Sequence, residues 1–351
     1  MKVLPEFTKA AFLVEQNKPL VVDKIKMPKE LYVGQVLVKI HVSGICGSQI
    51  GEIAGVKGPD KYLPHLMGHE GCGIVLETGP GVSTLQKGDK VILHWRKGTG
   101  IQAQNAVYEW NNKKLNAGWV TTFNNYAVVS ENRCTKIEKD FDNELASLFG
   151  CAITTGFGVV DNNAKLKLGE SVIVFGAGGV GLNIIQACKL NSAYPIIAVD
   201  LFDNRLELAS KLGATHIINS RKVDPIKKIE EILENKKIDV FIDNTGIPSI
   251  IEQGYELLTN EGRLVLVGVP RKNNNINIFS LPLHFGKQII GSHGGESQPH
   301  LDIPRYLKLF KNNMAEFKVL ISKRYSLEDI NQAINDMKEG KSAGRILIEM
   351  S

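Results

Sequence analysis

The chain has 351 residues, of which 43% are hydrophobic and 23% charged, and 42 Lys and Arg against 37 Asp and Glu give a net charge of +5. This hydrophobic content excludes a disordered protein, and the length favours two domains. No apolar run approaches the roughly 18 residues of a membrane helix, and the first ten residues lack the apolar segment of a signal peptide. The basic residues are scattered rather than gathered into a stripe. We therefore expect a soluble, cytoplasmic protein that binds neither membranes nor nucleic acid.

The first 150 residues read mainly as short strands separated by turns. Their apolar segments are rich in β-branched residues and are bounded by glycine or proline. Helical periodicity is scarce before Asn143. The predicted strands are 10–14, 36–42, 73–77 and 90–94.

From residue 171 the pattern changes to strands that alternate with helices. Ser171–Phe175 is a continuous apolar run, which is typical of a strand buried on both faces of a parallel sheet. Such alternation predicts βαβ units and an α/β fold with a doubly wound sheet. The further predicted strands are 196–200, 216–219, 239–243, 264–268 and 289–291, with helices at 180–190, 204–212, 225–234 and 248–258. The last predicted elements are helices at 303–311 and 327–338 and a strand at 345–349.

Glycines follow the first parallel strand in the order Gly-Ala-Gly-Gly-Val-Gly. Gly176, Gly178 and Gly181 fill the G-x-G-x-x-G frame, in which the glycines permit a tight turn, a close approach to a pyrophosphate and close packing of the helix. About 20 residues past this frame, Asp200 ends the second strand, where a carboxylate binds the adenosine ribose and repels a 2′-phosphate. The sequence therefore predicts NAD(H) binding. Arg205 is the nearby cation that could admit some NADP(H).

Two of the five cysteines and one histidine lie in glycine-rich loops. They are Cys46 in GICGS, His69 in MGHEG and Cys151 in FGCAITTG. Two thiols and an imidazole form a catalytic zinc set whose fourth position stays open for water or substrate. Their separations match no local zinc motif, and a lone cysteine is usually a small buried hydrophobe, so these residues alone leave zinc binding and core packing open. The remaining cysteines, Cys72, Cys134 and Cys188, read as core residues.

The order of these motifs resembles that of the medium-chain zinc-dependent alcohol dehydrogenases. It comprises the Cys-Gly-Ser loop, GHE, the later cysteine before TTG, and GAGGVG, and the likeness runs from KAAFLVE to GKSAGRILI. The resemblance implies a GroES-like, β-rich catalytic domain of residues 1–152 and 296–351, with an inserted Rossmann domain of residues 153–295. It also implies one catalytic zinc ion per chain, NAD(H), a small-molecule alcohol or carbonyl substrate, and a homodimer or homotetramer.

Matched position by position, the resemblance also implies roles for individual residues. It makes Cys46, His69 and Cys151 the zinc ligands, Glu70 the carboxylate behind them, and Ser48 the hydroxyl that receives the substrate proton. The implied cofactor residues are Thr155, Val267, Gly268 and Val269 at the nicotinamide end, and Gly176, Gly178, Gly179, Val180, Gly181 and Arg345 at the pyrophosphate, with Asp200 and Arg205 at the ribose. The predicted pocket residues are Trp95 and Phe123 from the resemblance and Arg96 from the cationic segment after His94.

Two departures from the family pattern bear on function. The segment after His94 lacks the four cysteines that hold a structural zinc in the family, so we expect no second zinc site. This segment is cationic and aromatic, and it is either a reorganised surface loop or a pocket wall for a polar or anionic substrate. Gly51 stands where many members have the histidine that ends the proton relay, so the proton would leave through Ser48, a ribose hydroxyl and water.

We therefore expect an NAD-dependent zinc dehydrogenase that acts on a secondary alcohol of a polyol, sugar or sugar derivative. One alternative is a simple aliphatic or aromatic alcohol dehydrogenase with Trp95 as a hydrophobic wall. Another is a zinc-free quinone or enoyl reductase of the same superfamily, and the Cys/His/Cys set argues against it.

Overall fold

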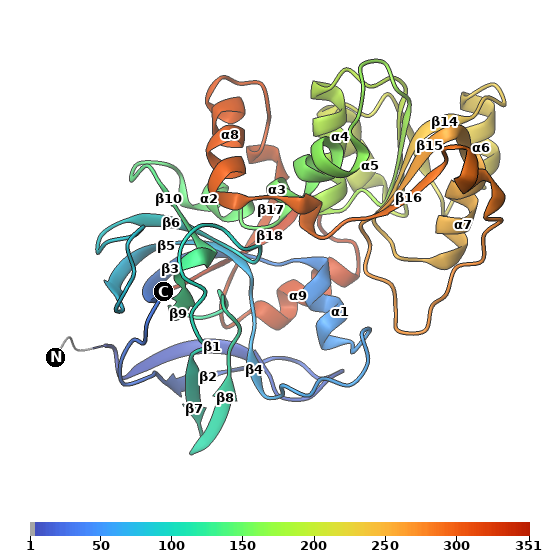
Figure 1. Ribbon diagram of the computed structural model, residues 1–351. Coiled ribbons are helices and arrows are strands. Elements are labelled where there is room, and N and C mark those ends of the chain that lie inside the picture. The colour runs from blue at the N-terminus through green and yellow to red at the C-terminus, as the bar shows by residue number, and fades with distance from the viewer. Residues whose placement is uncertain (1–3) are drawn as a thin grey trace.

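The structure, a computed structural model that describes residues 4–351, has two lobes that differ in their sheets (Figure 1). One lobe carries the β-rich first part of the chain together with the C-terminal strand. The other carries a six-stranded parallel sheet with helices on both faces. The predicted fold class, a GroES-like β-rich part with a doubly wound Rossmann sheet, is confirmed.

Apolar side chains on both faces explain how the parallel sheet is covered. In sheet order its strands are β13 (His216–Asn219), β12 (Ile196–Asp200), β11 (Val172–Phe175), β14 (Ile238–Asp243), β15 (Leu258–Leu266) and β16 (Gln288–Gly291). Its covering helices are α4 (Gly179–Leu190), α5 (Asp203–Leu212), α6 (Pro225–Ile232) and α7 (Pro248–Leu257). Val172 and Val174 pack with α4 and α5, whereas Ile173 and Phe175 pack with α6 and α7. A strand covered on both faces needs apolar residues at every position, which is why it reads as one apolar run.

The β-rich lobe consists of a closed barrel and a seven-stranded sheet. The barrel contains β1 (Phe7–Leu13), β2 (Val21–Lys26), β7 (Val107–Trp110), β8 (Lys113–Asn116) and β4 (His65–Leu66). The sheet contains β10 (Cys134–Ile137), β6 (Lys90–His94), β5 (Glu70–Thr78), β3 (Gln35–Gly44), β18 (Arg345–Glu349) and β17 (Ile321–Ser326), with β9 (Tyr126–Ser130) paired to β3. The remaining helices are α1 (Gly47–Ile53), α2 (Asn143–Leu148), α3 (Ala152–Gly158), α8 (Pro299–Lys311) and α9 (Ile330–Lys338), and α3 runs on into a π-helical turn, Val159–Ala164.

The last strand of the chain returns to the first lobe. Leu347 in β18 lies opposite Gly44 in β3, in an antiparallel pairing. Figure 1 accordingly shows the C-terminus among strands of the N-terminal part. The chain thus closes its first lobe with its last residues, whereas the domain limits at 152/153 and 295/296 stay predictions.

Helix α1 was not expected from the sequence. Of its seven residues only Gln49 and Ile53 are buried, so the helix presents no apolar stripe that periodicity could detect. The side chain of Gln49 accepts a hydrogen bond from the backbone N–H of Cys46 at 2.8 Å, which fixes the start of the helix. Strand β15 also begins six residues before the predicted strand at 264.

The segment after His94 contains a β-hairpin, β7–β8, that completes the barrel. Asn111 and Asn112 at its tip have φ of 50° and 59°, as a two-residue turn of this hand requires, and asparagine tolerates that conformation. Trp110 packs edge-on against Phe12 with ring centroids 5.0 Å apart, and its indole N–H donates to Asp23 at 2.7 Å. Hydrophobic packing and this hydrogen bond thus order the hairpin.

No helix among residues 4–351 is long and apolar enough to cross a bilayer.

His94, at the end of β6, is held neutral by its surroundings. Its Nδ1 lies 2.8 Å from the carbonyl of Arg96, an obligate acceptor, and its Nε2 lies 2.9 Å from the hydroxyl of Thr135. Nδ1–H therefore donates, and Nε2 accepts from Thr135. Burial lowers the pKa of His94 to about 4.

We expect the free energy of unfolding to fall as the pH drops from about 6.5 toward 4, partly because of His94. In that window the unfolded chain binds a proton that the folded His94 does not, so acid favours unfolding. A His94→Gln variant should lose less stability across this window than the native chain, by up to roughly 3 kcal/mol. Urea denaturation at several pH values measures this, with His284→Gln, an exposed position, as the control. Parallel stability curves for the native and His94→Gln chains would contradict it.

Candidate active site

The fold brings together the three predicted zinc ligands from distant parts of the sequence. Cys46 immediately precedes α1, His69 precedes β5, and Cys151 precedes α3. Their candidate ligand atoms all lie within 4.8 Å of one another, and the two sulfur atoms are 4.0 Å apart. The three side chains are therefore close enough to bind one metal ion together.

The chemistry of this cluster fits a zinc ion. Nε2 of His69 is buried and has no hydrogen-bond partner among the described residues, which leaves its lone pair or proton unsatisfied. A hydrogen bond from Cys151 lowers the pKa of Cys46 well below its ordinary value, and the charge of Arg345 acts in the same direction against the effect of burial. A thiolate and an unpaired imidazole are the groups that bind zinc.

Glu70 lies behind this cluster and is paired with Arg345. Both side chains are buried, and Glu70 Oε1 is 3.0 Å from Arg345 Nε, in an ion pair without hydrogen-bond alignment. The other carboxylate oxygen accepts a hydrogen bond from the backbone N–H of Ala152 at 3.1 Å, next to Cys151. Burial raises the pKa of Glu70, and the charge of Arg345 opposes that shift. Glu70 therefore supports the cluster from behind and does not line the cavity in front of it.

A cavity of about 1180 Å³ extends from the side chains of Cys46, His69 and Cys151 across the end of the parallel sheet. This is where open α/β sheets bind ligands, outside the carboxyl ends of their strands. All twelve predicted cofactor residues line it: Thr155, Gly176, Gly178, Gly179, Val180, Gly181, Asp200, Arg205, Val267, Gly268, Val269 and Arg345. Cys46, Ser48, His69, Trp95 and Cys151 line its other end.

The glycine loop has the geometry that a dinucleotide requires. Gly176 has φ of 95°, in the region that favours glycine, and a Cβ on Gly181 would lie 2.0 Å from the carbonyl oxygen of Gly176. A Cβ on Gly179 would lie 3.1 Å from the guanidinium of Arg345. Nη2 of Arg345 is buried without a hydrogen-bond partner among the described residues, so the guanidinium can still bind an anion at this loop.

Asp200 is held at the ribose end of the cavity. Its carboxylate accepts hydrogen bonds from the backbone N–H groups of Ala177 at 2.8 Å and Phe202 at 3.1 Å. Arg205 Nη1 lies 3.7 Å from the same carboxylate and its guanidinium stacks over Phe202. The negative charge at this end is therefore fixed in place, and Arg205 is directed toward it.

Two of the predicted pocket residues do not line the cavity among the described residues, and these predictions are corrected. Phe123 is 1% exposed and packs in a core cluster with Ala11 and Met67. Arg96 does not line the cavity itself, and its Nη1 donates to Nδ1 of His293, a residue that does, at 2.5 Å. Trp95 is the pocket residue that the structure retains.

His293 and its neighbours are the functional candidates that sequence reasoning missed. Ser292, His293 and Gly294 line the cavity directly after β16, and the ring of His293 meets that of Trp95 edge-on at 4.9 Å between centroids. Asn244 and Thr245 line it after β14 in the same way. Their position after the carboxyl ends of parallel strands is the signal that could have identified them.

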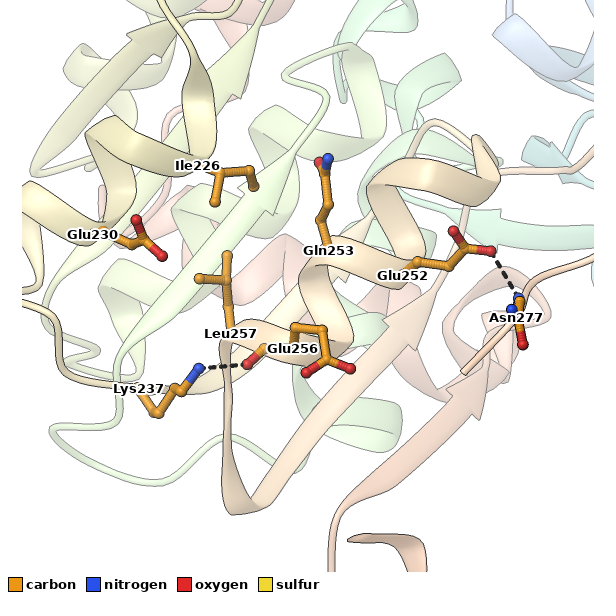
Figure 2. A pocket seen from close by; sticks show the side chains of 8 residues that line it. All are labelled: Ile226, Glu230, Lys237, Glu252, Gln253, Glu256, Leu257 and Asn277. Atoms are coloured by element: carbon orange, nitrogen blue, oxygen red, sulfur yellow. Dashed lines mark hydrogen bonds between the residues drawn. The ribbon is translucent and has the colours of Figure 1, made fainter. Parts of the chain in front are cut away.

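A second, smaller cavity of about 280 Å³ lies by α6 and α7 (Figure 2). Its charged lining is tied to the local backbone: Lys237 donates to the carbonyl of Glu256 and Glu252 accepts from the N–H of Asn277, both at 2.7 Å. It contains none of the predicted site residues. It therefore serves no role in the chemistry described above.

Replacing one sulfur ligand should remove the metal. We expect about one zinc ion per native chain and a loss of nearly all of it in Cys46→Ser, because two remaining ligands do not hold zinc tightly. Elemental analysis of dialysed protein measures both values, and Cys188→Ser, a buried cysteine in α4, controls for the loss of a thiol. Full zinc content in Cys46→Ser would overturn the ligand assignment.

Comparison with known proteins gives the family. The model of the zinc-binding dehydrogenase family matches residues 179–312, and that of the alcohol dehydrogenase GroES-like domain matches residues 33–139. An S-(hydroxymethyl)glutathione dehydrogenase of Synechocystis sp. is 30% identical over 97% of this chain and 99% of its own length. A class-3 alcohol dehydrogenase of Cereibacter sphaeroides is 29% identical over 97% of this chain and 99% of its own length.

Solved structures agree with these relatives. Benzyl alcohol dehydrogenase from Acinetobacter calcoaceticus superposes with a TM-score of 0.87 at 30% identity, over 99% of this chain and 100% of that one. An alcohol dehydrogenase zinc-binding domain protein from Burkholderia ambifaria superposes with a TM-score of 0.88 at 29% identity, over 98% of this chain and 99% of that one. The chain therefore belongs to the medium-chain zinc-dependent alcohol dehydrogenase family, as an NAD-dependent zinc enzyme that acts on an alcohol.

Proposed function

We propose that the enzyme transfers a hydride between NAD(H) and a secondary alcohol of a polyol, sugar or sugar derivative. The observation that carries this proposal is the polar wall formed by His293 beside Trp95 at the metal end of the cavity. A substrate with one hydroxyl group would leave His293, which is exposed, without a hydrogen-bond partner other than water. A neighbouring hydroxyl or carbonyl oxygen on the substrate would supply one.

The orientation of His293 makes it a hydrogen-bond donor. Its Nδ1 faces the guanidinium of Arg96, which can only donate, so Nδ1 accepts and Nε2 carries the hydrogen. The backbone N–H of His293 donates to Glu296 Oε1 at 3.0 Å, which holds the main chain of the residue. In this proposal Arg96 acts through His293 rather than by touching the substrate.

The reaction uses residues at both ends of the cavity. We assign Cys46, His69 and Cys151 as the ligands of the zinc ion, with Glu70 as the support behind them. When bound, zinc acts as a Lewis acid on the substrate oxygen and lowers the pKa of the hydroxyl. Ser48, which lines the cavity, accepts the substrate proton at its Oγ as the carbonyl product forms.

The cofactor residues orient the hydride acceptor that NAD⁺ supplies. Thr155 and the segment Val267–Val269 border the nicotinamide end, and the glycine loop with Arg345 binds the pyrophosphate. Asp200 binds the adenosine ribose and repels a 2′-phosphate, with Arg205 at the border.

A second substrate candidate follows from the relatives and one feature of the cavity. Several relatives are named S-(hydroxymethyl)glutathione dehydrogenase, and that alcohol carries carboxylates. Lys57 and Lys61 line the cavity and are cations of the kind that binds them. A simple aliphatic or aromatic alcohol, with Trp95 as a hydrophobic wall, is the third candidate.

A substrate panel decides among these candidates. We expect polyols or sugars to be oxidised with a higher kcat/KM than simple alcohols or S-(hydroxymethyl)glutathione, measured by NADH absorbance. In His293→Leu the preferred substrate should lose roughly tenfold in kcat/KM, the cost of one lost hydrogen bond, while simple alcohols change little. His216→Leu, in β13, is the matched control. Equal losses for all substrates, or a preference for simple alcohols, would contradict the proposal.

We also propose that the enzyme is a homo-oligomer that pairs through β16. This strand lies at the edge of the parallel sheet, where its backbone groups are open to another strand. An exposed apolar segment precedes it, comprising Phe279, Leu281, Leu283 and Phe285. Apolar clusters of this kind mark contact surfaces.

Removing this apolar surface should weaken the oligomer. We expect native protein to sediment as a dimer or tetramer and Phe279→Ser/Phe285→Ser to shift toward a monomer at micromolar concentration, because two exposed aromatic rings lose their contacts. Leu168→Ser, another strongly exposed apolar position, should leave the mass unchanged. A native protein that sediments as a monomer would exclude the proposal.

A further inference from the structure

A group of three ionisable side chains lies beside the cavity and takes no part in the roles assigned above. Asp60 and Glu52 line the cavity, and His65 lies against both of them. His65 Nε2 is 2.9 Å from Asp60 Oδ2 and 3.7 Å from Glu52 Oε1. The side chains of His65 and Asp60 are largely buried, whereas that of Glu52 is 44% exposed.

The hydrogen bonds of His65 hold this group together. Nδ1 of His65 lies 2.9 Å from the carbonyl oxygen of Leu66, which can only accept, so Nδ1 holds a hydrogen. Nε2 faces a carboxylate oxygen of Asp60 at hydrogen-bond distance. Asp60 and His65 therefore form one hydrogen-bonded pair. The carboxylate of Glu52 is the next acceptor near Nε2 of His65, at 3.7 Å.

Helix α1 connects this group to Ser48. Ser48 and Glu52 are four residues apart on the helix, so their side chains are neighbours on one face, with Cβ atoms about 5–6 Å apart. Both residues line the same cavity. Gly51, which lies between them in sequence, carries no side chain, and a Cβ there would lie 3.0 Å from the side chain of Val56.

We propose that Glu52, backed by His65 and Asp60, is the proton acceptor that follows Ser48 during alcohol oxidation. As the hydride leaves the substrate carbon for NAD⁺, the hydroxyl proton passes to Ser48, and the proton of Ser48 passes through water to the Glu52 carboxylate. Glu52 then releases it to solvent at its exposed edge. The sum of these steps is alcohol and NAD⁺ giving carbonyl, NADH and one proton. The inference rests on the proposed role of Ser48.

Lysine residues from two loops lie near the C-terminal end of α1. Lys57 and Lys61, from the loop after α1, line the same cavity. Lys272, from the loop after β15, packs its side chain against Gly58, and its backbone N–H donates to Val56 at 2.7 Å.

The test compares Glu52→Gln with the native enzyme in alcohol oxidation. We expect kcat to fall roughly tenfold to hundredfold near neutral pH, at or below the lower end of a general acid–base contribution, with KM for the alcohol and affinity for NADH unchanged. Activity should recover at higher pH and with added imidazole buffer, which carries the proton in place of the carboxylate. Glu15→Gln, an exposed position outside the cavity lining, should behave like the native enzyme in all of these measurements.

Further variants keep the result interpretable. Asp60→Asn should give a smaller fall in kcat with the same response to imidazole, and it replaces Glu52→Gln if that variant fails to fold. Ser48→Ala with Glu52→Gln should be no slower than Ser48→Ala alone, because both residues serve one route. An unchanged kcat in Ser48→Ala would refute the proposed function of Ser48 instead. A native kcat and pH profile in Glu52→Gln would overturn the inference. So would a second metal ion bound by Glu52, Asp60 and His65 in the native protein and lost from that variant.

Discussion

The buried ion pair between Glu70 and Arg345 holds the two ends of the chain and both halves of the active site together. Neither charge can remain buried without the other, because an unpaired charge in this interior would cost several kcal/mol. Glu70 begins β5 beside His69, and Arg345 begins the last strand, β18. The backbone N–H of Ala152, at the start of α3 and next to Cys151, donates to the carboxylate of Glu70. The position of the metal cluster therefore depends on residues from the start, middle and end of the chain.

This pair also connects the metal cluster to the cofactor loop. The guanidinium of Arg345 lies against Gly179 and keeps Nη2 free, so one cation balances the carboxylate behind the metal and faces the predicted pyrophosphate. The cavity runs from this point along the carboxyl ends of the parallel strands. Metal, hydride acceptor and substrate can then meet at the junction of the two lobes, where neither lobe alone would close a site.

The features that depart from the family pattern are explained by local packing. Where the family has a lobe with four cysteines, this chain builds the hairpin β7–β8 around an Asn-Asn turn and the packing of Trp110 on Phe12. The same stretch of chain brings Trp95 and Arg96 to His293, and this contact makes the metal end of the cavity polar.

The sequence by itself determined what local chemistry can encode. An apolar run read as a doubly covered strand, the glycine frame read as a nucleotide loop, and Asp200 read as the end of β12, because each depends on neighbours in the chain. Only the tertiary structure decided that Cys46, His69 and Cys151 meet, that Phe123 belongs to the core, and that His293 lines the cavity. These contacts join residues far apart in sequence, so no periodicity or spacing carries them. Helix α1 was missed because only one of its two buried residues, Ile53, is apolar, so the helix carries no apolar pattern along the chain.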